Sequence, residues 1–254
     1  MKEKEELRKI AEYYDQRARV ANGVRAAGQW REYEYIEEIC EEIVNKINVE
    51  KTDRVLELGC GSGVLGNWVR KKCASYYGID LSHGMLKKFL EEYRTEQKPN
   101  VVQSLTERVP FRDHLFNVIV MNGVTMYFSN NEILKKTLIE IERLASHRST
   151  IFIGENIVPS GYSWELVWFQ NLPGIARCFV EPYVRIRRWL VKHSILIGKW
   201  RSMHNTVSPR VIREYFKDKG VVTESDAAAY STRKRKMEKS YKGNRRKDFV
   251  IKLG

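Results

Sequence analysis

The stretch RVLELGCGSGVLGNWVRKKCASYYGID, residues 54–80, decides the fold of this chain. Its apolar start, with Val55, Leu56 and Leu58, is typical of a buried parallel strand. The strand breaks at once into the glycine-rich turn Gly59–Gly63. Glycine permits a sharp turn and lets a ligand approach the main chain, because no Cβ stands in the way. We therefore expect a ligand to bind at this turn.

The rest of the stretch completes a strand–helix–strand unit. Residues 64–72 can form a helix whose N-terminus faces the ligand, and residues 76–80 predict a second strand that ends in Asp80. An acid at the tip of the second strand lies where a ribose presents its hydroxyls. Residues 61–66, GSGVLG, satisfy GxGxxG, so a nicotinamide or flavin cofactor is one alternative. A bare turn without a ligand is the other.

A more specific string is ELGCGSG, residues 57–63, which resembles the first motif of class I S-adenosylmethionine-dependent methyltransferases. Residues 78–86, GIDLSHGML, resemble the second motif of the same family, and residues 110–120 resemble its fourth-strand region. As a whole the chain resembles the small-molecule type of this family. The resemblance implies an α/β, Rossmann-like class I methyltransferase fold. That fold is a seven-stranded, mostly parallel sheet with helices on both faces, here with a helical insertion after strand five. The implied cofactor is S-adenosyl-L-methionine.

The resemblance also implies which residues hold this cofactor. They are Tyr14, Glu57, Gly59, Gly61, Gly63, Asp80, Leu81, Met85, Thr106, Glu107, Asn122, Gly123, Val124 and Tyr127. Leu81 and Met85 would pack against the adenine, although plain core packing explains Met85 equally well. Leu105 stands where many of these enzymes have an aspartate for the adenine amino group, which leaves the backbone near Thr106 and Glu107 to recognise it.

The N-terminal segment YYDQR, residues 13–17, resembles a lid that closes over the cofactor in many small-molecule methyltransferases. There Tyr14 would reach the cofactor or the substrate. The alternative is that the tyrosine packs on the core.

The chain has 254 residues, which fits one α/β domain with an elaboration, or two small domains as the alternative. We expect a single methyltransferase domain built from a helical lid and scaffold (1–50), a cofactor-binding core (51–155), an aromatic and basic helical insertion that covers the substrate (156–207), and a C-terminal helix with strands six and seven (208–254).

The sequence pattern also predicts the individual elements. The expected helices cover residues 2–20, 36–47, 64–72, 82–93, 129–145 and 208–219. The expected strands cover residues 54–58, 76–80, 100–102, 116–121, 150–155, a stretch from 221, and 248–253.

The composition constrains where in the cell the protein is found and whether it holds disulfides or a metal. The start MKEKEELRKI is too charged for a secretory signal, and no apolar stretch approaches the roughly 20 residues of a membrane-spanning helix. We therefore expect a cytoplasmic protein. Cys40, Cys60, Cys73 and Cys178 form no CxxC pair, and the five histidines show no ligand-like spacing. We expect free thiols and no metal.

Charge is distributed unevenly along the chain. Residues 1–155 hold 24 basic and 24 acidic residues, whereas residues 156–254 hold 21 and 8, so the whole net charge of +13 is C-terminal. The excess is concentrated in residues 156–206 and 231–247. In the sheet of this family both segments emerge beside the substrate opening, which predicts an anionic acceptor. A solvated positive surface is the alternative.

The favoured function is transfer of a methyl group to an O, N or C atom of a small or medium-sized, anionic or amphiphilic acceptor. Aromatic and basic segments also suit a membrane surface or RNA, so a methyltransferase acting on a membrane-associated lipid or on RNA is a second hypothesis. A third is a non-catalytic cofactor-binding protein with the same fold. Candidates for a general base are Tyr14, Glu155, Tyr162, His193 and His204.

Overall fold

The computed structural model describes residues 2–21, 23–26, 35–93, 99–157, 207–228, 231–232 and 246–254. The expected insertion over residues 156–207 and the basic segment over residues 231–247 lie almost entirely outside these residues. Tyr162, His193 and His204 lie outside them as well. The expectations placed on those segments therefore stay predictions.

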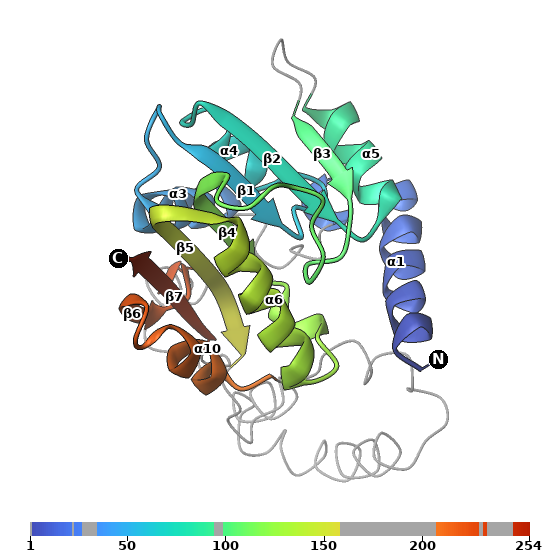
Figure 1. Ribbon diagram of the computed structural model, residues 1–254. Coiled ribbons are helices and arrows are strands. Elements are labelled where there is room, and N and C mark those ends of the chain that lie inside the picture. Colours follow the sequence, from blue (N-terminus) through green and yellow to red (C-terminus); the bar gives the residue numbers. More distant parts are fainter. Residues whose placement is uncertain are drawn as a thin grey trace, which may run out of the picture.

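Within the described residues, seven strands form one sheet in the order β3-β2-β1-β4-β5-β7-β6 (Figure 1). The strands are β1 (Arg54–Leu58), β2 (Ser75–Asp80), β3 (Asn100–Gln103), β4 (Phe116–Asn122), β5 (Ala145–Ile157), β6 (Gly220–Asp226) and β7 (Arg246–Leu253). The strands from β3 to β5 pair in parallel, while β7 is antiparallel to both β5 and β6. This arrangement confirms the predicted mostly parallel sheet. It differs from the order 3-2-1-4-5-6 of dinucleotide-binding folds.

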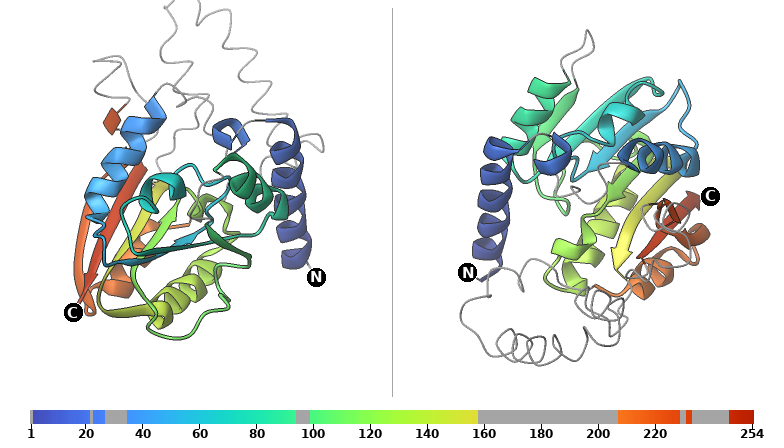
Figure 2. Two further views of the ribbon diagram at one scale, coloured as in Figure 1. Left: turned by 90° about the horizontal axis from the view of Figure 1, so that it is seen from above. Right: turned by 180° about the vertical axis from the view of Figure 1, so that it is seen from behind.

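Helices cover both faces of this sheet (Figure 2). They are α1 (Lys2–Val20), α2 (Gly23–Ala26), α3 (Ile36–Ile47), α4 (Gly66–Val69), α5 (His83–Glu92), the 3-10 turn η2 (Thr125–Tyr127), α6 (Asn131–Leu144) and α10 (Pro209–Phe216). One face packs against α3, α4 and α5, and the other against α6 and α10. No helix in the described part of the chain is both long and apolar enough to span a membrane.

The apolar run of β1 is explained by burial on both faces of the sheet. Val55 packs in the cluster formed with α3, whereas Leu56 and Leu58 pack in the cluster formed with α6. All three side chains are fully buried. Successive side chains of a strand point to opposite faces, so an inner strand covered on both sides contains few polar residues.

Several boundaries differ from the predictions. Helix α10 ends at Phe216 rather than at residue 219, and β5 begins at Ala145 rather than at residue 150. The helix expected over residues 64–72 is reduced to α4, because the backbone N–H groups of Ala74 and Ser75 donate to the Asp53 carbonyl and direct the chain into β2. The helix predicted from residue 129 begins at Asn131, and its N-cap is Asn130. Asn130 Oδ1 accepts from the backbone N–H groups at positions 132 and 133, which satisfies two donors at the helix start.

Candidate functional site

The glycine-rich turn lies at the carboxyl end of β1, and its three glycines have different roles. Gly59, Gly61 and Gly63 have φ angles of 74°, 54° and 79°, in the left-handed region that favours glycine. A Cβ at Gly59 would overlap the Val124 side chain, and one at Gly63 would overlap the Phe89 ring. A Cβ at Gly61 would meet nothing within 4 Å. Gly61 is therefore the position where a ligand has room to approach the backbone.

Asp80, at the end of β2, faces this turn. The backbone N–H of Gly61 donates to Asp80 Oδ2 at 2.9 Å, and that of Ser82 donates to Oδ1 at 2.8 Å. Burial raises the pKa of Asp80, and these two hydrogen bonds act in the opposite direction. A carboxylate oxygen accepts more than one hydrogen bond, so both oxygens can still take ribose hydroxyls. The open backbone of Gly61 and the carboxylate beside it fit a nucleoside.

Glu57 lies inside the fold, on β1 behind the turn. Its carboxylate accepts a hydrogen bond of 2.6 Å from the Tyr76 hydroxyl, whose oxygen packs against Gly66. Burial raises the pKa of Glu57 to about 8. Glu57 thus supports the turn from within the core.

Two further side chains attach the N-terminal helices to this site. Asp15 of α1 accepts hydrogen bonds from the Ser82 hydroxyl at 2.5 Å and from the backbone N–H of Gly84 at 2.8 Å. The Ser62 hydroxyl donates to the Gly23 carbonyl at 2.5 Å. Asp15 and Ser62 could not be predicted from the sequence, because no local pattern relates residues that are 67 or 39 positions apart.

Tyr14 of α1 and Tyr127 of η2 are brought together by the fold. Their hydroxyls are hydrogen-bonded to each other, and their rings meet edge to face with centroids 5.6 Å apart. Burial raises the pKa of Tyr14 well above its ordinary value and also raises that of Tyr127. Both phenols are therefore neutral hydrogen-bonding groups at physiological pH.

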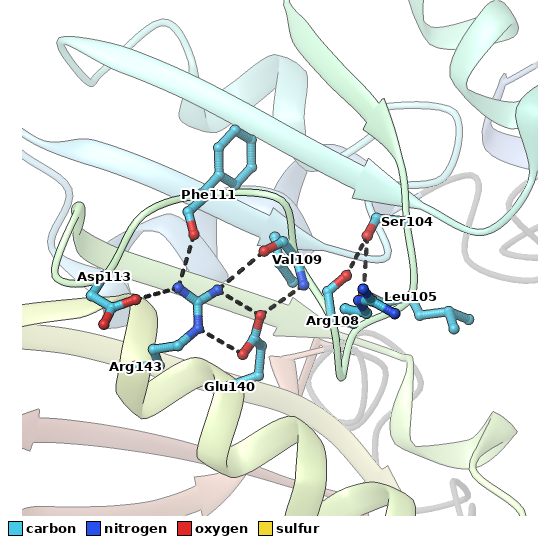
Figure 3. Close-up of polar contacts among 8 residues, drawn as sticks. All are labelled: Ser104, Leu105, Arg108, Val109, Phe111, Asp113, Glu140 and Arg143. Atoms are coloured by element: carbon cyan, nitrogen blue, oxygen red, sulfur yellow. Dashed lines mark hydrogen bonds and ion pairs between the residues drawn. The ribbon is translucent and has the colours of Figure 1, made fainter.

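The loop between β3 and β4 is held against α6 by Arg143 (Figure 3). Its guanidinium donates to the carbonyls of Val109 and Phe111 at 3.1 and 2.8 Å and to the Asp113 carboxylate at 2.6 Å. It also binds both oxygens of Glu140, at 2.7 and 2.8 Å. Glu140 in turn accepts from the Val109 backbone N–H at 2.7 Å. This cluster fixes the path of the loop, and no local sequence pattern predicts it because its members lie about 30 residues apart.

The predicted adenine-recognition residues lie in the same loop. The Ser104 backbone N–H donates to the Asp80 carbonyl at 3.0 Å, which sets the start of the loop beside the ribose carboxylate. Thr106 shares a hydrogen bond of 3.1 Å with Thr137 of α6, and Glu107 accepts one of 3.3 Å from Thr106. The side chains of both predicted residues are thus held by local partners, which leaves their backbone for an adenine edge.

The other predicted residues lie after β2, on α5 and after β4. Leu81 follows Asp80 directly, and Met85 is buried with Ala18 and Ala26 of the N-terminal helices, as the core-packing alternative expects. Gly123, with φ 69°, donates its backbone N–H to Gly154 at 3.2 Å and thereby joins the ends of β4 and β5.

The described residues include two candidate general bases, Tyr14 and Glu155, and three of the four cysteines. Glu155, at the end of β5, forms an ion pair with Arg246. Cys40, Cys60 and Cys73 are free thiols. Within the described ranges, no group of three or more His, Cys, Asp or Glu side chains is arranged to hold a metal ion.

A family model matches the centre of the chain. Residues 56–153 match a family model described as a methyltransferase domain. A bovine 18S rRNA (guanine-N(7))-methyltransferase is 26% identical over 103 residues, which are 41% of this chain and 35% of that protein. The chain matches about a third or less of the length of its curated relatives.

Comparison with solved structures shows the same fold. Phosphoethanolamine N-methyltransferase 1 of Haemonchus contortus, solved with phosphoethanolamine and S-adenosylhomocysteine, aligns with a TM-score of 0.68 at 9% identity, over 98% of this chain and 49% of that one. A Haloferax volcanii methyltransferase in complex with the activator Trm112 aligns with a TM-score of 0.61 at 17% identity, over 96% of both chains. The predicted class I methyltransferase fold is confirmed, and the family match supports the predicted cofactor.

Proposed function

We propose that this chain, whose residues 56–153 form a methyltransferase domain with the class I fold, binds S-adenosylmethionine and transfers its methyl group to an acceptor. The observation that carries the proposal is the pairing of Gly61 and Asp80. The backbone of Gly61 is open to a ligand, and it also donates to the carboxylate that would accept the ribose hydroxyls.

The residues of the chain would bind and orient the cofactor. When bound, S-adenosylmethionine supplies a methyl group already activated on a sulfonium. The protein then has to hold methyl and acceptor in line and to exclude water. Asp80 would hold the ribose, and the backbone at Thr106 and Glu107 would meet the adenine. The segment Asn122–Val124 would border the sulfonium, with Tyr127 beyond it.

The acceptor in this proposal is a small or medium-sized molecule that carries negative charge. The net charge of residues 156–254, with 21 basic against 8 acidic residues, supports this choice. Two similar proteins are named for 18S rRNA and for phosphoethanolamine. Both of these molecules carry phosphate, which agrees with an anionic acceptor. Binding of an anion by such a segment weakens as the salt concentration rises. Methyl transfer that is equally fast at low and high salt would contradict an anionic acceptor.

RNA is a second candidate acceptor, and the identity of 26% over 103 residues with an rRNA methyltransferase favours it. A gel-shift assay with structured RNA, followed by transfer of labelled methyl from S-adenosylmethionine, tests this alternative. A shift together with label in the RNA supports it, whereas no shift at low salt excludes it. Co-sedimentation with anionic vesicles tests a membrane-associated acceptor in the same way.

Calorimetric titration with S-adenosylmethionine, S-adenosylhomocysteine and NADH tests the proposed cofactor. We expect binding of both sulfur compounds in the micromolar range and loss of that binding in Asp80→Ala. Asp218→Ala is a matched control, because Asp218 is exposed beyond the end of α10. Binding of NADH in place of the sulfur compounds, or of none of the three, would contradict the proposal.

A further inference from the structure

The end of β5 contains a strained corner that the cofactor site does not use. Glu155 has φ 59°, a left-handed conformation that is unfavourable for a residue with a side chain. The pairing of β5 with β7 shifts register between Ile153 and Asn156, so the strain lies in a bulge. Strained backbone of this kind is concentrated at functional sites.

Charged partners hold this corner in place. The Glu155 backbone N–H donates to Asp248 Oδ1 at 2.9 Å, and Glu155 Oε2 forms an ion pair with Arg246. The other oxygen of Asp248 accepts from Lys46 Nζ at 2.8 Å and from the Ala228 backbone N–H at 3.0 Å. Lys46 also pairs with Glu42 at 3.5 Å, so the network contains three carboxylates and two cations and is formally negative before any ligand arrives.

Two oxygen atoms at this corner lack a donor. Glu155 Oε1 and Asn122 Oδ1 are both buried and accept no hydrogen bond from any residue that the structure describes. The Glu155 residue is only 7% exposed. Buried polar atoms are normally hydrogen-bonded, so each oxygen calls for a donor that the described residues do not provide.

The two oxygens lie at adjacent strand ends. Asn122 of β4 is paired with Gly154 of β5, so its backbone lies about 5 Å from that of the residue before Glu155. A Cβ at Gly154 would overlap Asn122 Oδ1, which shows that the amide occupies the space above this glycine. Ligands of open α/β sheets bind at the carboxyl ends of the strands, and both oxygens are at that edge.

We propose that Glu155 and Asn122 form the acceptor subsite and that this subsite takes a primary amino group. Glu155 Oε1 and Asn122 Oδ1 each need a hydrogen-bond donor. One amino group has at least two N–H donors, whereas one hydroxyl has a single O–H donor. The inference rests on the proposed function, because it places the amino group beside the segment that would border the sulfonium. Together with the anionic acceptor proposed above, it indicates a small phosphate ester that carries an amine.

A matched pair of probes tests the subsite. The protein saturated with S-adenosylhomocysteine is titrated with 2-aminoethyl phosphate and with ethyl phosphate, which share the phosphate and differ in the amine. We expect the amine to improve affinity by about tenfold or more, as for hydrogen bonds to a charged group. Glu155→Gln should reduce this difference to about twofold and leave the affinity for S-adenosylhomocysteine unchanged.

Glu224→Gln is the control variant, because Glu224 also pairs with an arginine, Arg213, but lies on the edge strand β6. It should preserve the preference for the amine. Equal affinity for the two probes, binding of neither, or a preference that survives Glu155→Gln would overturn the subsite even if S-adenosylhomocysteine binds. Failure of S-adenosylhomocysteine to bind wild-type protein would overturn the proposed function and the subsite with it.

Discussion

The hydroxyl groups of Tyr14 and Tyr127 are hydrogen-bonded to each other although 113 residues separate them in the chain. The contact joins α1 to η2, the short turn that follows β4. Because η2 begins directly after the segment Asn122–Val124, the tyrosine pair places α1 beside the strand end where the sulfonium is proposed to lie. Asp15, the next residue of α1, adds bonds to Ser82 and Gly84.

Removal of either tyrosine hydroxyl should weaken cofactor binding. A net hydrogen bond contributes about 1 kcal/mol, so we expect Tyr14→Phe and Tyr127→Phe each to reduce the affinity for S-adenosylhomocysteine by about 3- to 10-fold in calorimetry. The double variant should be no weaker than the single ones, because both remove the same contact. Tyr13→Phe, which loses only the hydrogen bond from Arg17, should bind normally. Additive losses would show that the two tyrosines act independently.

Alanine at two glycines of the turn should separate ligand binding from packing. Gly63→Ala should lower the free energy of unfolding by about 2–4 kcal/mol, because its methyl overlaps the Phe89 ring in a left-handed conformation. Gly61→Ala should cost only about 1 kcal/mol, since nothing lies within 4 Å of its Cβ, but should reduce the affinity for S-adenosylhomocysteine more than tenfold. Urea denaturation and calorimetry measure the two effects. Tight binding by Gly61→Ala would show that the ligand does not approach this backbone.

Glu57 should make the stability of the protein depend on pH. Burial raises its pKa from 4.5 to about 8, so between these values the folded protein keeps a proton that the unfolded chain has released. The contribution of Glu57 to stability is therefore fully present below about pH 4.5 and is lost as the pH rises through about 8.

Urea denaturation at several pH values between 5 and 8 measures this effect. The decline in the free energy of unfolding with rising pH should be shallower in Glu57→Gln than in wild type, by roughly 1 kcal/mol per pH unit. The exposed Glu132→Gln should keep the wild-type slope. An unchanged slope in Glu57→Gln would show that Glu57 is ionised in the folded protein.

Loss of the Arg143 guanidinium should release the loop between β3 and β4. We expect Arg143→Met to lower the free energy of unfolding by about 2–3 kcal/mol, because Glu140, with a side chain only 13% exposed, loses its ionic partner. Arg210→Met is the control: its pair with Glu214 is on an open helix surface, so the loss should stay below about 1 kcal/mol. Similar losses in the two variants would contradict a structural role for the cluster. Weaker binding of S-adenosylhomocysteine by Arg143→Met alone would place the loop at the cofactor.

Local sequence patterns predicted most elements but not all of their ends. The strands β1 and β2 and the helix α3 match their predicted ranges within a residue. The helix after the glycine turn is shorter than predicted, because its end depends on hydrogen bonds to Asp53 on the other side of β1. Helix α6 begins at Asn131, two residues after its predicted start, because Ser129 and Asn130 are both good N-cap residues and a local pattern does not choose between them.

The sequence by itself determined the parallel core, the glycine turn and the carboxylate of Asp80. Each depends on residues that are neighbours in the chain, where apolar periodicity and backbone freedom act directly. Only the tertiary structure decided which glycine is open to a ligand, that Tyr14 meets Tyr127, and that Glu155 lies in a strained corner beside Asn122. Those relationships arise from the pairing and packing of distant segments, so their physical cause is burial and hydrogen bonding between elements that no local pattern connects.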